Sequence, residues 1–129
     1  MNLKNKMQLF GSIFMLIAIL LGAIATHYLE RFISSESIVS FEVGVRYLTY
    51  HALALLVLSS ISFSSKRVKQ NIFNLITLGI LLFSGSIFLL SFQAVIPFSL
   101  RFLGPITPIG GGFLIIGWCL VLWSLIKKS

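Results

Sequence analysis

Residues 7–29 read MQLFGSIFMLIAILLGAIATHYL, and this stretch contains no charged side chain. A helix rises about 1.5 Å per residue, so about 20 apolar residues cross the roughly 30 Å hydrocarbon core of a bilayer. Three more uncharged runs follow, at residues 47–65, 70–100 and 102–126. Each run is long enough to cross a membrane. The sequence therefore predicts four transmembrane segments.

The composition excludes a soluble protein. Hydrophobic residues make up 57% of the 129 positions, and the mean hydropathy is +1.03, which is more apolar surface than a globule of this size can bury. Residues 13–20 are continuously apolar, whereas the strands of a membrane barrel alternate polar and apolar residues. We therefore expect an all-α membrane protein.

The predicted architecture is one transmembrane domain, residues 1–129, that forms a bundle of four helices. The expected helices cover approximately residues 7–28, 37–65, 71–96 and 105–127. Ser37 and its neighbouring serines are N-cap candidates for the second helix, and Pro97 is expected to end the third. The segment between the first two helices contains Leu29, Phe32 and Ile33, and we expect it to lie along the membrane interface.

The charges predict the orientation in the membrane. Four crossings place both termini and the middle loop on one side, which carries seven of the ten basic residues and no acidic one: Lys4, Lys6, Lys66, Arg67, Lys69, Lys127 and Lys128. The other side is neutral, with Arg31, Arg46 and Arg101 against Glu30, Glu36 and Glu42. Because basic loops stay inside, we expect both termini in the cytoplasm and the protein in the cytoplasmic membrane. The net charge of +7 is therefore interpreted as a signal for orientation rather than for nucleic-acid binding, and the same basic clusters could also bind anionic lipid headgroups.

Small residues indicate where helices pack closely. Gly22 belongs to a small-residue face of the first helix, and Gly85 belongs to a short repeat shared by the first and third helices. Gly110, Gly111 and Gly117 belong to the fourth helix, where they would let another backbone approach. Such faces fit the interior of one chain as well as a homo-oligomer or a membrane-protein partner.

The few polar residues near the outer ends of the helices are the candidate site. This predicted cluster comprises His27, Glu42, Arg46, Tyr50, His51, Ser84, Ser86 and Gln93. Glu42 and Arg46 are four residues apart, which favours an ion pair. We expect His51 to be neutral and to form a hydrogen bond with Ser86 or Ser84, because the helical rise places them at comparable depth. The alternative is a proton relay or a ligand site.

Catalytic and metal-binding motifs are absent from the sequence. The chain contains no aspartate, no cysteine cluster and no P-loop or nucleophile elbow, and its two histidines lack a diagnostic spacing. We therefore expect no enzyme activity, no bound metal and no cofactor.

Four stretches of the sequence resemble a known family. They are LGAIATH at 21–27, FEVGVRYLTYHALAL at 41–55, FSGS at 83–86 and LGPITPIGG at 103–111. Together they resemble the domain-of-unknown-function 423 family, and the likeness spans nearly the whole chain.

This resemblance implies a small bacterial inner-membrane protein of four helices whose family has no settled biochemical function. The family motif around the first helix usually reads Gly-Ala-Phe-Gly-Ala-His. Ile24, Ala25 and Thr26 depart from it, which implies a looser contact for the first helix.

The expected function is a non-enzymatic scaffold, lipid-associated protein or accessory subunit. The alternative is a small oligomeric transporter or proton-coupled exporter, with the outer polar cluster as its entrance. No Asp or Glu is expected near the middle of the membrane, where a site for proton coupling usually needs a carboxylate. This absence argues against a proton-coupled exporter.

Overall fold

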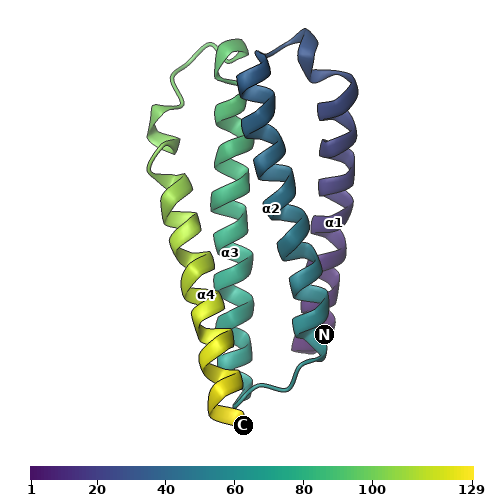
Figure 1. Cartoon of the computed structure of the whole chain (residues 1–129), viewed down its shortest axis with the longest axis vertical. Helices are drawn as coiled ribbons and strands as arrows, with labels where there is room; N and C mark the ends of the chain where they lie inside the picture. Colours follow the sequence, from purple (N-terminus) through teal and green to yellow (C-terminus); the bar gives the residue numbers. More distant parts are fainter.

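The computed structural model describes residues 1–129 and contains four long helices and no strand (Figure 1). The long helices are α1 (Leu3–His27), α2 (Ser35–Ser60), α3 (Lys66–Ser91) and α4 (Ile106–Lys128). Short 3-10 turns, η1 (Leu29–Arg31), η2 (Gln93–Val95) and η3 (Arg101–Leu103), lie in the connections. All four helices have the length and hydropathy of a membrane span. The predicted all-α architecture with four membrane-length helices is confirmed.

Side-chain caps stand at the starts of α1, α2 and α3, whereas α4 begins after Pro105 without one. The side chain of Asn2 accepts a hydrogen bond from the backbone N–H of Asn5 at 2.8 Å, and the Ser65 hydroxyl accepts one from the N–H of Val68 at 3.1 Å. Each cap satisfies a backbone donor that the first helical turn leaves free. For this reason α1 and α3 begin at Leu3 and Lys66, several residues before their uncharged runs.

The helix ends also differ from the expectation. The Lys69 ammonium donates hydrogen bonds to the carbonyl oxygens of Ser59 at 2.6 Å and Ile61 at 2.9 Å. These bonds satisfy carbonyls that the last turn of α2 leaves free, and α2 ends at Ser60.

Pro97 does not end the third helix. α3 ends at Ser91, and Pro97 lies in the loop beyond it. The Gln93 side chain closes that loop, because its amide donates to the Phe98 carbonyl at 2.9 Å and accepts from the Leu100 N–H at 2.6 Å.

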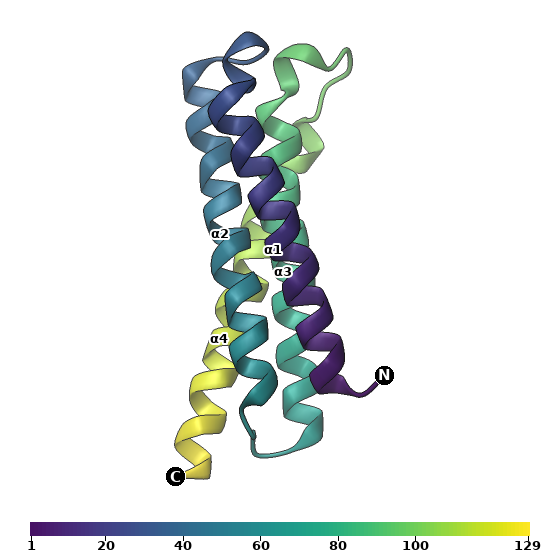
Figure 2. The same ribbon diagram turned by 90° about the vertical axis from the view of Figure 1, so that its right-hand side faces the viewer.

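The helices form an open arrangement instead of a closed ring. α1 packs along α2, α2 along α3 and α3 along α4, while α1 has only slight contact with α3. α1 and α4 lie at opposite edges in Figure 1, and both chain termini lie at the end that holds the α2–α3 connection (Figures 1 and 2). α2 and α4 do not pack closely along their lengths.

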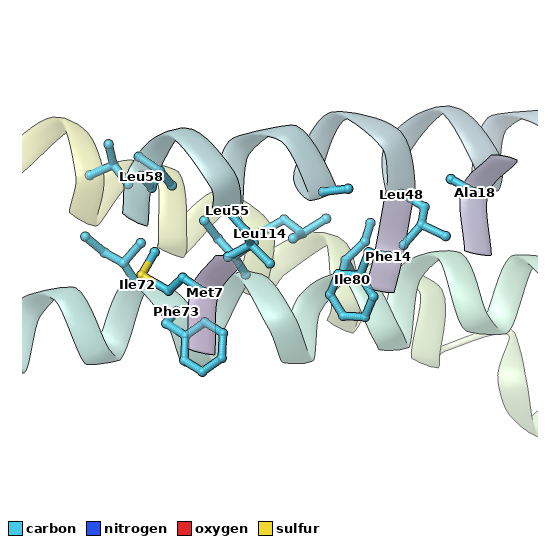
Figure 3. Close-up of a cluster of buried hydrophobic side chains, with 13 residues drawn as sticks. Met7, Phe14, Ala18, Leu48, Leu55, Leu58, Ile72, Phe73, Ile80 and Leu114 are labelled. Atoms are coloured by element: carbon cyan, nitrogen blue, oxygen red, sulfur yellow. The ribbon is translucent and has the colours of Figure 1, made fainter. Parts of the chain in front are cut away.

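The main core joins all four helices (Figure 3). Its buried members are Met7, Phe14, Ala18, Leu48, Ala52, Leu55, Leu58, Ile72, Phe73, Ile76, Ile80, Leu114 and Val121. A second cluster, Ala25, Leu29, Ile33 and Phe41, holds the η1 turn against α1 and α2. Phe32 of the same segment remains exposed.

Candidate functional site

His51 is buried on α2 with 6% of its surface exposed. Its Nδ1 lies 2.7 Å from the carbonyl oxygen of Tyr47, and the indole Nε1 of Trp118 on α4 donates to its Nε2 at 3.1 Å. A carbonyl only accepts and an indole N–H only donates. The contacts therefore assign a neutral imidazole with its proton on Nδ1.

The predicted serine partners of His51 are wrong. Ser84 is buried and donates to the carbonyl oxygen of Gly44 at 2.7 Å. Ser86 donates to the Phe83 carbonyl at 3.0 Å and lies 2.6 Å from the hydroxyl of Thr107. Counting residues along a helix gives the depth of a side chain but not the rotation of the helix about its axis, and the rotation decides the partner.

A groove lies between α2 and α4, where these helices do not pack together. It has a volume of about 460 Å³ and is lined by Tyr47, His51, Phe83, Gly111, Leu114, Ile115 and Trp118. Phe83 of α3 forms its floor, with the ring centroid 4.9 Å from that of Tyr47. The groove is predominantly apolar, and His51 and Trp118 stand at its deep end.

A second cavity continues this surface toward the outer end of the helices. It has a volume of about 260 Å³ and is lined by Ser37, Ser40, Ile87, Leu90, Ser91 and Thr107. Thr107 is one turn from Gly111 on α4, and Ile87 is one turn from Phe83 on α3, so the two cavities lie in line. We call the pair the α2–α4 trough. Its outer part is rich in hydroxyl groups and its deep part is apolar.

The predicted outer cluster does not form. His27 is exposed on α1, and Glu42, Arg46 and Tyr50 are exposed on α2. The charged groups of Glu42 and Arg46 do not come within the 4.0 Å of an ion pair. An exposed i, i+4 pair of this kind contributes little to stability. Gln93 is bound to its own loop. The structure contains no group of three or more His, Cys, Asp or Glu side chains that could hold a metal.

The predicted packing glycines differ in how closely the neighbouring helix approaches them. A Cβ at Gly110 would lie 2.4 Å from the Phe83 nitrogen, and one at Gly117 would lie 3.3 Å from Ile76. Both glycines therefore allow close contact of α4 with α3. Gly22 and Gly111 have more room, with the nearest atoms at 3.5 and 3.6 Å. A Cβ at Gly85 would meet no atom within 4 Å, because Gly85 lines a cavity of about 160 Å³ together with Phe14 and Leu48. The close packing predicted at Gly85 is therefore wrong.

Sequence reasoning missed Trp118, Gly44 and Gly79 as contact residues. A Cβ at Gly44 would meet the Phe88 ring at 2.6 Å, and one at Gly79 would meet Leu114 at 2.9 Å. The spacing of Thr107, Gly111, Leu114 and Trp118 at intervals of four, three and four marks one helix face. From this spacing the sequence could have predicted that Trp118 lies on the same helix face as the other α4 residues that line the trough.

Most of the residues that line the trough lie in the part of the chain that matches a known protein family. Residues 21–111 match the family described as "Protein of unknown function (DUF423)". The chain belongs to the DUF423 family. The matched residues include the outer part of the trough and His51, and they end before Trp118.

Similar proteins occur in several bacteria. The chain is 34% identical to the UPF0382 membrane protein YwdK of Bacillus subtilis over 121 residues, which cover 92% of this chain and 94% of the relative. It is 33% identical to a UPF0382 membrane protein of Staphylococcus haemolyticus over 94% of this chain and 98% of the relative. A UPF0382 membrane protein of Haemophilus influenzae is 29% identical, covering 98% of both chains.

The DUF423 chain is therefore a small membrane protein, as its four membrane-length helices and its relatives both show. The predicted family is confirmed. The family description assigns no activity. No solved structure matches the chain.

Proposed function

We propose that this protein is a non-enzymatic, lipid-associated component of the bacterial cytoplasmic membrane that holds one lipid acyl chain in the α2–α4 trough. The observation that carries this proposal is the change of lining along the trough, from hydroxyl groups at the outer end to apolar side chains at depth. A membrane lipid has the same order of polar and apolar parts.

The length of the trough is close to the hydrocarbon thickness of one membrane leaflet. Eleven residues separate Ser40 at the outer end from His51 at the deep end, which corresponds to about 17 Å along α2. Half of a hydrocarbon core is about 15 Å. An acyl chain that enters at the outer surface would therefore end near His51 and Trp118.

The hydroxyl groups at the outer end suit the polar linkage of a lipid. Ser37, Ser40, Ser91 and Thr107 line this cavity, and hydroxyls both donate and accept hydrogen bonds. No charged side chain lines either cavity. We therefore assign contacts with ester or headgroup oxygens rather than recognition of a headgroup charge.

The basic residues support an orientation with both termini in the cytoplasm. The end of the molecule that holds the termini and the α2–α3 connection carries seven basic residues and no acidic one. Under the positive-inside rule this end is cytoplasmic. The trough then opens toward the outer leaflet.

The structure offers little support for a transporter. Toward the cytoplasmic end, Ser124 of α4 is joined to Ser64, because its hydroxyl accepts from the Ser64 N–H at 3.1 Å and donates to the Ser64 hydroxyl at 3.1 Å. Lys128 donates to the Ser62 carbonyl at 2.9 Å. These contacts join α4 to the α2–α3 connection below the trough. Both nitrogens of His51 are already occupied, which leaves no free site for a proton relay.

A pair of neighbouring glycines tests the proposal. Gly111 lines the trough, whereas a side chain at Gly112 would enter open space. Gly111→Leu should fill the trough and lower the fraction of protein that retains a lipid in native mass spectrometry after mild extraction. Gly112→Leu is the matched control and should retain lipid like the unmodified protein. Equal retention in both variants, or no retained lipid in the unmodified protein, would overturn the proposal.

A further inference from the structure

Three polar residues form a stripe on the face of α3 next to Phe10 of α1. Gln70, Asn74 and Thr77 are separated by four and three residues, so they share one helix face. The Gln70 amide donates to the side-chain oxygen of Asn74 at 2.8 Å, and Asn74 is exposed. We call this face the α3 stripe.

The α3 stripe extends into the hydrocarbon region. Asn74 lies eight residues beyond Lys66, the first residue of α3, which is about 12 Å along the helix. Thr77 lies one turn deeper. Water is scarce at this depth, and a polar group without a hydrogen-bond partner is costly in lipid.

Two groups of the stripe have unused hydrogen-bonding capacity. The amide nitrogen of Asn74 donates no hydrogen bond in the structure, since its only side-chain contact is the one that its oxygen accepts from Gln70. The hydroxyl of Thr77 is buried and has no hydrogen-bond partner. A lipid tail offers no donor or acceptor to the exposed Asn74 amide, whereas the Thr77 hydroxyl is enclosed by this chain itself.

The stripe borders a shallow apolar cavity of about 420 Å³. Its lining residues are Phe10, Phe73, Asn74, Thr77, Leu78 and Leu81. Leu78 and Leu81 are exposed beside Asn74. The face thus combines apolar side chains that can interdigitate with amide groups that need a partner.

We propose that the α3 stripe is the interface between two copies of this chain, which pack α3 against α3 about a two-fold axis along the membrane normal. The chemistry is self-complementary. Each Asn74 has a free N–H₂ group, and Asn74 and Gln70 each keep a free acceptor site on their oxygen. Under two-fold symmetry the donor of one copy meets the acceptor of the other and the reverse.

The depth and the apolar flanks favour a second copy over lipid. Amide groups that cross between membrane helices stabilise association, whereas exposure to acyl chains leaves them unsatisfied. This interface lies on the α1 side of α3, and the trough lies between α2 and α4. The dimer is therefore independent of the proposed function.

Disulfide trapping tests which face meets the second copy. Cys119 is the only cysteine, so a Cys119→Ser background allows single cysteines to be placed. Leu78→Cys in liposomes should form a disulfide-linked dimer on mild oxidation. Leu122→Cys, exposed on α4, is the matched control and should remain monomeric. Equal dimer yields at both positions, or none at Leu78→Cys, would overturn the proposal.

The strength of the association tests the role of Asn74. Asn74→Leu removes both symmetry-related hydrogen bonds and should raise the dimer dissociation constant about 8- to 300-fold in liposomes, the range expected for two interhelical hydrogen bonds. Energy transfer between labelled copies at increasing lipid dilution measures this constant. Asn5→Leu removes an exposed amide on α1, outside the stripe, and should leave the dissociation constant unchanged. An unchanged constant in Asn74→Leu, or the same change in both variants, would overturn the assignment.

Discussion

The indole nitrogen of Trp118 donates a hydrogen bond to Nε2 of His51 across 3.1 Å. This bond joins α4 to α2, two helices that pack poorly along their lengths. It also closes the deep end of the trough. His51 is therefore a structural residue with both ring nitrogens occupied, and Trp118 fixes the position of α4.

Removing this bond should loosen the contact between α2 and α4. Trp118→Phe keeps an aromatic ring but lacks the N–H donor. We expect the free energy of unfolding in detergent to fall by about 0.6 to 1.7 kcal/mol, as for other interhelical hydrogen bonds in membranes. Trp123→Phe, which is exposed on the same helix, should change it less. A double-mutant cycle with His51→Phe should show coupling, and strictly additive effects would contradict the bond.

The hydrogen bond between Ser84 and the carbonyl of Gly44 should stabilise the contact of α3 with α2. Its oxygen atoms are 2.7 Å apart, and Ser84 is 1% exposed. We expect Ser84→Ala to lower the free energy of unfolding by about 0.5 to 1.5 kcal/mol. Ser12→Ala, at an exposed position on α1, is the control. Equal unfolding free energies for the two variants would show that the bond does not contribute.

Gly110 and Gly112 should respond in opposite directions to alanine. A Cβ at Gly110 would clash with the Phe83 nitrogen at 2.4 Å, whereas one at Gly112 would meet nothing within 4 Å. Gly110→Ala should force α4 away from α3 and cost about 1 to 3 kcal/mol. Gly112→Ala should be neutral or stabilise the helix by up to about 1 kcal/mol. Thermal unfolding in detergent measures both, and a tolerated Gly110→Ala would show that the close contact is incorrect.

The orientation in the membrane can be tested with single cysteines in a Cys119→Ser background. Asn2→Cys, Arg67→Cys and Lys128→Cys should resist an impermeant thiol reagent in intact cells, because the basic end faces the cytoplasm. Ser99→Cys, in the loop at the opposite end, should react. Labelling of the first three with protection of the last would reverse the topology.

The four helices could be predicted from the sequence because charged residues interrupt long apolar runs. Their ends could not, because they depend on individual contacts. Asn2 and Ser65 extend two helices toward their N-termini, and Lys69 ends α2 through bonds that cross the loop. A hydropathy profile does not reveal such capping contacts.

The candidate site was predicted less completely. The burial and hydrogen bonding of His51 followed from the cost of an unpaired polar group in lipid, and the structure agrees. Its partner depended on how each helix is rotated. The packing of Gly44 against Phe88 and of Gly79 against Leu114 sets this rotation, and neither contact is visible in a single sequence.

Photo-crosslinking tests the central claim, which is that the α2–α4 trough holds a lipid acyl chain. A phospholipid with a photoreactive diazirine near the end of its chain would be incorporated at low abundance, and the labelled peptides would be mapped. We predict that label concentrates on Tyr47, Leu114 and Trp118 and that Gly111→Leu removes this preference. Equal labelling of these residues and of Leu53 and Ile116, which are exposed outside the trough, would contradict the claim.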